Sequence, residues 1–210
     1  MSPLRNRVTP FGELIADPAR GLVFGNRGRL HDPTGRVLRG HDGKRWIACR
    51  LEFRGRHRLP MPPGRYTGLF FLDEATAFAA GHRPCAECRH EDYMRFTSRW
   101  QGIHPQLRGA DAIDAQLHAE RLEPGGKRQR HHLAPLEGLP DGSFVLRRDA
   151  PFMVKGSRLW RWTPGGYVEP LARGRGTVTV ITPPSLVAVL NAGWETSVPL
   201  FHPTAEPAHR

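Results

Sequence analysis

A chain of 210 residues is long enough for one domain with appendages or for two small domains, and its 20 prolines and 23 glycines exclude a long helical bundle. Its net charge of +11, carried by 28 arginines and 3 lysines, favours a polyanionic partner such as nucleic acid, although a genome rich in G and C would produce the same arginine bias. The chain has three cysteines, no signal-peptide core and no run of about 18 apolar residues, so we expect a reduced cytoplasmic protein without disulfides or a membrane span.

The first 30 residues show little periodicity, and we expect them to form a turn-rich arm. Glycines in the stretch 25–32 would let the backbone approach a phosphate, but the strand–loop–helix pattern of a phosphate loop is missing. A β-hairpin is predicted next, in which residues 37–38 lead to the turn dipeptide at 42–43 and residues 46–53 return as a strand. One face of that strand carries Ile47, Cys49, Leu51 and Phe53.

A short helix is predicted over residues 71–80, after a strand-like stretch at 66–72. Asp73 is a suitable N-cap for this helix, and the helix should end at Gly81. The chain then reaches a C-x-x-C pair, whose two sulfurs can point at one centre and suit a zinc ion or a redox dithiol. The pair consists of Cys85 and Cys88.

The segment from Glu74 to Arg89 combines an alanine-rich helix with the pattern G-x-R-P-C-x-x-C-R. This combination resembles the second half of the zinc module at the N-terminus of Ada-type DNA methylphosphotriester repair proteins. The resemblance covers about residues 45–90. It implies that Cys49 corresponds to the first zinc cysteine of that module, which is the methyl acceptor in the family. Phe53 stands where the family has its second zinc cysteine.

Zinc prefers about four ligands, and the cysteines supply at most three. We therefore predict a site made of Cys49, Cys85, Cys88 and one histidine, while a plain buried thiol remains the alternative for Cys49. His31 ranks first for the fourth position, because the neighbouring Asp32 could orient its ring. The other candidates are His41, His57 and His82.

Two helices are predicted in the middle of the chain. The first runs from Cys88 to Trp100 and carries a core face of aromatic residues. The second covers residues 110–122, and its charged stripe lies inside the apolar face, which favours either a satisfied ion-pair network or a catalytic or metal-binding wall. The basic loop at 125–132 follows and could add a histidine to that wall. The candidate catalytic residues are Asp114, His118, Arg121 and His131.

The C-terminal part is predicted to be a small barrel or meander, because short β-compatible stretches alternate with Gly and Pro turns. A short helix should cover residues 186–192, and we expect little order beyond His202. Four aromatic residues fit the core better than base stacking: Trp160, Trp162, Tyr167 and Trp194. The predicted strands are 143–147, 151–155, 158–162 and 177–182.

Taken in chain order, these elements predict an α+β protein. A small zinc-stabilised α/β module with an N-terminal arm occupies 1–103, a helix with a basic loop occupies 104–135, and a β-rich region with a short helix occupies 136–210. The expected function is that of a zinc-binding protein that interacts with nucleic acid, DNA rather than RNA, in repair or processing. The predicted nucleic-acid contacts are Arg54, Arg56, Arg58, Arg83, Arg89, Lys127, Arg128 and Arg130.

Three other functions stay open at this point. One is a metal-dependent nuclease or phosphodiesterase that would use Asp114, His118 and the basic loop. Another, implied by the resemblance to the Ada-type module, is direct methyl transfer to Cys49. The third is a non-catalytic structural or partner-binding module. The sequence leaves undecided whether the protein is an enzyme and which oligomeric state it adopts.

Overall fold

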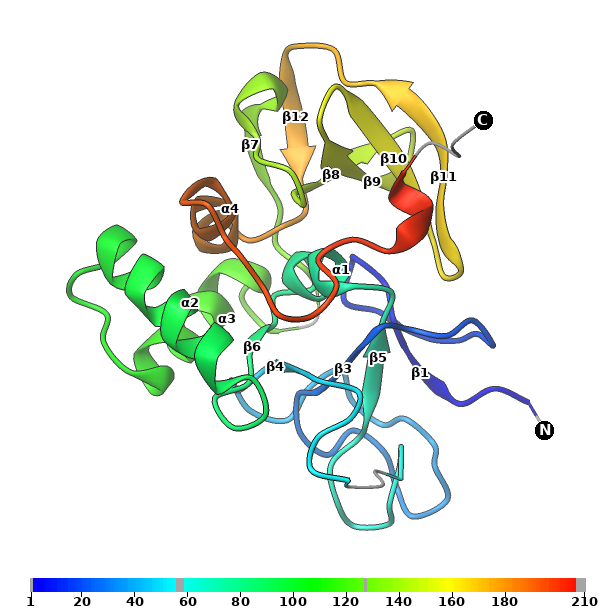
Figure 1. Ribbon diagram of the computed structural model, residues 1–210. Helices are drawn as coiled ribbons and strands as arrows, with labels where there is room; N and C mark the ends of the chain where they lie inside the picture. The colour runs from blue at the N-terminus through cyan, green and yellow to red at the C-terminus, as the bar shows by residue number, and fades with distance from the viewer. Residues whose placement is uncertain (1, 56–58, 127, 207–210) are drawn as a thin grey trace.

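The computed structural model describes residues 2–55, 59–126 and 128–206. In this part of the chain, two six-stranded sheets and four α-helices confirm the predicted α+β class. Figure 1 shows the two sheets at opposite ends of the molecule, with α1 between them and the helices α2 and α3 to one side. Among these residues no helix is long and apolar enough to cross a membrane.

The N-terminal sheet has the strand order β2-β1-β5-β3-β4-β6. The pairs β1–β5 and β4–β6 are parallel, and the other pairs are antiparallel. The expected turn-rich arm therefore contributes three strands to a sheet. Its strands are β1 (Arg5–Val8), β2 (Leu14–Ala16), β3 (Val23–Asn26), β4 (Ile47–Cys49), β5 (Leu69–Phe71) and β6 (Arg83–Pro84).

The predicted hairpin over residues 37–53 is wrong. Strand β4 pairs with β3 and β6 instead, while Val37 forms only an isolated bridge with His31. The strand also ends at Cys49, and Leu51 is exposed. Alternating hydrophobicity identified a strand correctly, but a two-residue repeat contains no information about which strand becomes the partner.

The C-terminal sheet is antiparallel throughout, with the order β11-β10-β9-β8-β12-β7. The four consecutive strands β8 to β11 form a meander. All four predicted strands are present, and two more, β7 and β11, were not predicted. The strands are β7 (His132–Pro135), β8 (Phe144–Arg147), β9 (Ala150–Lys155), β10 (Arg158–Thr163), β11 (Gly166–Ala172) and β12 (Thr177–Val180).

Three helices share one apolar cluster beside the sheets. They are α2 (His90–Ile103), α3 (Ala110–Arg121) and α4 (Pro184–Asn191), and all three lie where the sequence predicts helices. Trp194, one of the four aromatic residues predicted for the core, packs in this cluster, and the other three are buried against the C-terminal sheet. The cluster therefore joins α1, α2 and α3 to α4 and the segment that follows it.

The short helix α1 (Glu74–Ala79) has no solvent-exposed face, because all six of its residues are buried. Ala77 packs into the core of the N-terminal sheet, whereas Ala75 and Ala79 pack into the core of the C-terminal sheet. Phe78 packs among the other helices. A short helix that is buried on every side is stable only inside a protein. Three apolar clusters, at the two sheets and among the other helices, all include residues of α1.

Asp73 caps this helix as predicted and also holds two other segments of the chain. Its carboxylate accepts hydrogen bonds from the backbone and hydroxyl of Thr76 at 2.8 Å, from the Tyr167 hydroxyl at 2.7 Å and from the backbone N–H of His202 at 2.8 Å. The side chain is fully buried. The expectation of little order beyond His202 is wrong for residues 203–206, because a 3₁₀ turn follows and Tyr167 donates its backbone N–H to Thr204. Residues 207–210 lie outside the described part of the chain.

Replacing Asp73 with alanine should lower the free energy of unfolding by about 1–3 kcal/mol at pH 7, because several buried donors lose their acceptor. Urea denaturation followed by circular dichroism measures the change. The matched control is Asp111→Ala, an exposed carboxylate in the first turn of α3, which should cost less than about 0.5 kcal/mol. Equal effects of the two substitutions would contradict the role of Asp73.

The loss of unfolding free energy caused by Asp73→Ala should also depend on pH. Burial outweighs the hydrogen bonds and raises the pKa of Asp73 to about 6. Between about pH 4 and pH 6 the folded chain therefore binds more protons than the unfolded chain at this site, so the stability it contributes falls as the pH rises. The difference in unfolding free energy between wild type and Asp73→Ala should be about 1 kcal/mol larger at pH 5 than at pH 7.

Candidate metal centre

Three cysteines from two distant segments converge in the N-terminal half. Cys49 ends β4, and the parallel strand β6 runs beside it, so that the backbone N–H of Cys85 donates to the carbonyl of Ala48 at 2.9 Å. The turn that follows β6 brings in Cys88 just before α2 begins. The three sulfur atoms lie within 4.8 Å of one another, all three residues are buried, and none is in a disulfide.

The chain reaches this geometry because α1 stops abruptly. Gly81 has a positive φ of 81°, and a Cβ at this position would meet the Arg121 side chain at 2.6 Å. The backbone N–H groups of Gly81 and His82 cap carbonyls of α1 at 2.8 and 2.9 Å. Two residues after Gly81, Arg83 pairs with Ile47 on β4. This register places Cys85 next to Cys49.

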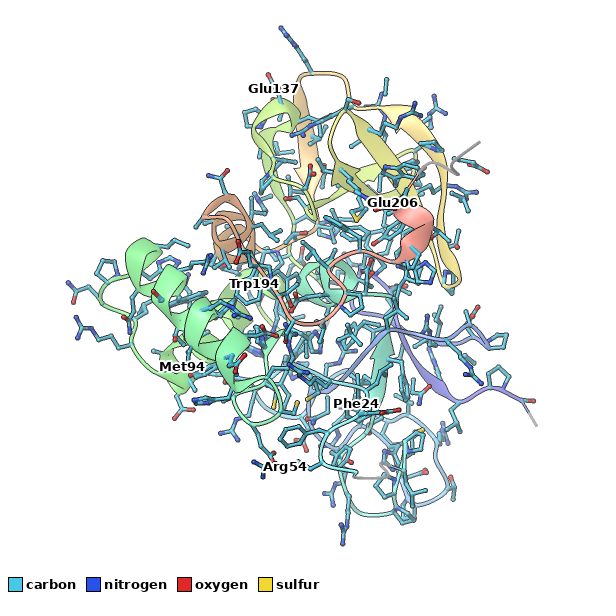
Figure 2. All side chains as sticks on the ribbon, in the orientation of Figure 1. Phe24, Arg54, Met94, Glu137, Trp194 and Glu206 are labelled. Atoms are coloured by element: carbon cyan, nitrogen blue, oxygen red, sulfur yellow. The ribbon has the colours of Figure 1, made fainter. Side chains whose placement is uncertain are left out.

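An apolar shell surrounds the sulfurs. Phe24 lies opposite Cys49 on the neighbouring strand β3 and belongs to the same buried cluster as the three cysteines. Figure 2 labels Phe24 and Arg54, which lie on the side of the molecule formed by the N-terminal sheet. Other side chains packed against the cluster are Ile47, Phe53, Tyr66 and Phe70. Such a shell excludes water and strengthens the interaction of thiolates with a cation.

The thiols perturb one another strongly. Hydrogen bonds from Cys49 and Cys88 stabilise a thiolate at Cys85 and hold its pKa far below the ordinary value. Hydrogen bonding to Cys85 raises the pKa of Cys49. At Cys88 the contact with Cys49 lowers the pKa, but hydrogen bonding to Cys85 and burial outweigh it, and the net pKa is raised. One negative charge is thus favoured in the cluster, and a bound cation would be needed to favour three.

The spacing of the sulfurs fits a tetrahedral thiolate site. Zinc–sulfur bonds of about 2.3 Å at tetrahedral angles place pairs of sulfurs about 3.8 Å apart. The observed upper bound of 4.8 Å accommodates that separation. The three cysteines therefore form a group that could hold a metal ion.

The structure does not bring the predicted histidine to this group. The Nδ1 atom of His31 lies 2.6 Å from the Thr67 hydroxyl, and the ring is not part of the cysteine cluster. The ring of His82 is buried between Phe71 and Trp46. His41 packs against Trp46 and His118, again away from the cysteines. His57 lies outside the described residues.

The inward stripe of α3 is an ion-pair network around Asp114. Both carboxylate oxygens of Asp114 accept hydrogen bonds from Arg83, at 2.9 and 2.7 Å, and both residues are buried. Of the two arrangements predicted for this stripe, a satisfied ion-pair network and a catalytic or metal-binding group, the structure contains the ion-pair network. Asp114 could act as a base only by leaving Arg83 without its counter-ion.

The other predicted catalytic residues have partners other than Asp114. Nδ1 of His118 accepts from Arg121 at 3.2 Å, and burial lowers the pKa of His118 to about 4, so the ring is neutral at pH 7. Arg121 itself donates to the carbonyls of Gly81 and Lys44. His131 contacts Gln129 and Phe11 instead. Among the described residues these side chains do not assemble into a metal-binding group.

Two of the predicted nucleic-acid contacts are internal. Arg83 is held by Asp114, and Arg89 pairs with Glu74 and with Asp92, the latter at 2.7 Å. Both arginines are at most 2% exposed and cannot reach a phosphate backbone. Arg54, Arg128 and Arg130 are exposed, whereas Arg56, Arg58 and Lys127 lie outside the described residues.

One group of polar residues was not recognised from the sequence. Arg27, Trp46 and Arg121 stack together in the interior, although they are far apart in the chain. In the sequence, Arg121 is a catalytic candidate and Arg27 lies in the glycine-rich stretch 25–32, but nothing connects the two. No spacing rule links residues that come from a helix end and from two separate segments near β3 and β4.

Comparison with known proteins gives no relative: no family model, no curated protein and no solved structure matches the chain. What the protein does is therefore inferred from its own residues.

The substitution Asp114→Asn should lower the free energy of unfolding by about 3–5 kcal/mol, because a side chain of the same shape leaves the Arg83 charge buried and unpaired. Urea denaturation measures the loss. Asp111→Asn, on the exposed side of the same helix, is the control and should cost less than about 0.5 kcal/mol. A cost for Asp114→Asn as small as that of the control would show that the buried pair does not stabilise the fold.

Proposed function

We propose that this chain is a zinc-binding protein that interacts with nucleic acid, with DNA as the preferred partner. The observation that carries the zinc assignment is the convergence of three buried cysteines from two separate segments. Cysteine sulfurs in an apolar surrounding select zinc over hard cations such as Mg²⁺ and Ca²⁺, which take oxygen ligands. The C-x-x-C turn at the start of a helix and its resemblance to the Ada-type module support the same metal.

Zinc at this position would hold three elements together. Cys49 belongs to the N-terminal sheet, while Cys85 and Cys88 lie on the turn that leads into α2. Zinc draws thiols into their thiolate form, and its positive charge would offset the repulsion among three neighbouring thiolates. The three cysteines supply three of the four positions that zinc prefers. Cys49 is only 3% exposed, so this arrangement favours a structural role over methyl transfer at its sulfur.

The nucleic-acid assignment is supported by charge. The chain has a net charge of +11. Some of its arginines are paired with carboxylates inside the fold, but 15 arginines are exposed in the described residues, so much of the positive charge lies on the surface. Arg128 and Arg130 are exposed on the loop after α3, and Arg54 is exposed beyond β4. Arginines on loops can follow a phosphate backbone without competing for the sheet hydrogen bonds.

Purified protein should contain one zinc ion per chain by elemental analysis. Cys85→Ser should lose most of the metal and unfold at lower temperature, because a thiolate ligand is removed from a site coupled to folding. His31→Gln is the control and should retain full zinc content, because the His31 ring contacts Thr67 rather than the cysteines. Purified wild-type protein that holds no metal, and takes up none when zinc is added, would contradict the assignment.

Labelled duplex DNA should bind with an affinity that falls steeply as salt increases, through counterion release. The double substitution Arg128→Ala/Arg130→Ala should weaken binding by at least about fivefold and reduce the slope of log Kd against log salt by about 1–2. Fluorescence anisotropy measures both. The matched control is Arg147→Ala/Arg148→Ala, which removes two exposed arginines at the end of β8 and in the turn that follows it.

Single-stranded DNA and RNA of the same length serve as competitors. Tighter binding to either of these would contradict the preference for DNA duplexes. Absence of binding to all three, or an affinity that does not change with salt, would refute the nucleic-acid proposal and leave the zinc assignment untouched.

A further inference from the structure

Three buried arginines in the described part of the chain form no ion pair with a carboxylate: Arg7, Arg27 and Arg121. Arg27 and Arg121 lie together in the interior. Arg27 is 2% exposed and Arg121 is 1% exposed. Arg27 donates to the carbonyl of Gly12 at 2.7 Å, and Arg121 donates to the carbonyls of Gly81 and Lys44 at 2.8 and 2.6 Å. The Nε atom of each finds no acceptor among the described residues.

This pair differs from the other two fully buried arginines. Arg83 and Arg89 are each neutralised by carboxylates at 2.7 Å, which is how a protein normally tolerates a charge in its interior. Carbonyl acceptors orient a guanidinium but do not cancel its charge. The interior near Arg27 and Arg121 therefore keeps two positive charges.

Both charges lie against the same tryptophan. The guanidinium carbons of Arg27 and Arg121 are 4.6 and 3.9 Å from the ring centroid of Trp46. Contact with a ring face stabilises each cation modestly and holds its orientation. Burial lowers the pKa of both arginines to about 9, so both remain protonated at neutral pH. Two like charges against one ring are a costly arrangement that a bound anion would relieve.

The two arginines line a cavity of about 520 Å³. Its walls come from the turn between β1 and β2, from the loop before β4 and from the end of α3. Phe11, Ile15 and Leu38 provide an apolar side. A volume of this size accommodates a small organic molecule, and the combination of an apolar wall with a few charged groups is typical of ligand sites.

The charge balance of the cavity favours a dianion. Among the described residues that line the cavity, Glu13 is the only carboxylate, and the lining also contains Arg5, which offsets its charge. Arg39, also in the lining, faces Asp42 at 3.5 Å near the surface and adds little net charge. A phosphate monoester carries nearly two negative charges at pH 7 and offers acceptors in several directions, whereas a carboxylate carries one.

We propose that this cavity binds the phosphate group of an organic phosphate monoester, with Arg27 and Arg121 as the contacting cations and the apolar wall beside the organic part. The monoester could belong to a small metabolite or to the 5′-phosphate end of a nucleic acid, since both present the same group. The site contains none of the three cysteines, so the proposal does not depend on zinc.

Phenyl phosphate is a suitable probe, because it joins a dianionic phosphate to an apolar ring. Isothermal titration calorimetry should show saturable binding of one molecule per chain. Benzoate should bind at least about tenfold more weakly, because it lacks the second charge. Arg27→Met should weaken phenyl phosphate binding by at least about tenfold, while Arg158→Met, an exposed arginine on β10, should leave it unchanged.

A second pair of variants avoids the risk that a buried substitution disturbs folding. Leu38 is 58% exposed and lines the cavity, so Leu38→Glu places a negative charge there at an exposed position. This variant should weaken phenyl phosphate binding several-fold. Leu133→Glu is the matched control, because Leu133 is 71% exposed on β7 and does not line the cavity.

The source of the phosphate is decided by two further ligands. A 5′-phosphorylated oligonucleotide that binds no better than its 5′-hydroxyl form, while phenyl phosphate binds, identifies a small-molecule site. A gain from the 5′-phosphate that Leu38→Glu abolishes identifies a nucleic-acid end. The proposal is overturned if phenyl phosphate shows no saturable binding, if benzoate binds equally well, or if Leu38→Glu and Leu133→Glu bind it alike.

Discussion

The fold depends on the complete burial of one short helix. All six residues of α1 are buried, and the helix contributes side chains to three apolar clusters, one at each sheet and one among the other three helices. Complete burial requires that the polar groups at the helix start be satisfied inside the protein. Asp73 does this by accepting from Tyr167 and His202 as well as from the helix, and Glu74 accepts from Trp194 at 3.0 Å.

The cysteine centre depends on the same helix. Gly81 ends α1, and β6 then aligns with β4 so that Cys85 lies beside Cys49. Arg89 follows the C-x-x-C turn and pairs with Glu74 at the other end of α1. The turn is thus fixed from both sides by contacts to one helix. Arg83 and Arg89, which the sequence predicted as nucleic-acid contacts, therefore help to position the cysteines.

The arginines of this chain fall into three groups that composition alone cannot separate. Arg83 and Arg89 are buried and paired, which makes them part of the architecture. Arg128 is one of the exposed group, on which the nucleic-acid proposal rests. Arg27 and Arg121 are buried against Trp46, and their acceptors are backbone carbonyls and the His118 ring, with no carboxylate among them. A buried charge without a counter-ion is expensive, and that cost is why this third group points to an anionic ligand.

The sequence by itself determined what depends on neighbours in the chain. The Asp73 cap, the stop at Gly81 and the C-x-x-C turn are local, because each involves residues within a few positions of one another. Only the tertiary structure decided which strand lies beside β4, which refuted the hairpin and excluded His31 from the cysteine cluster. It also decided which arginines are neutralised, because Coulomb energy depends on distances between segments that no local pattern records.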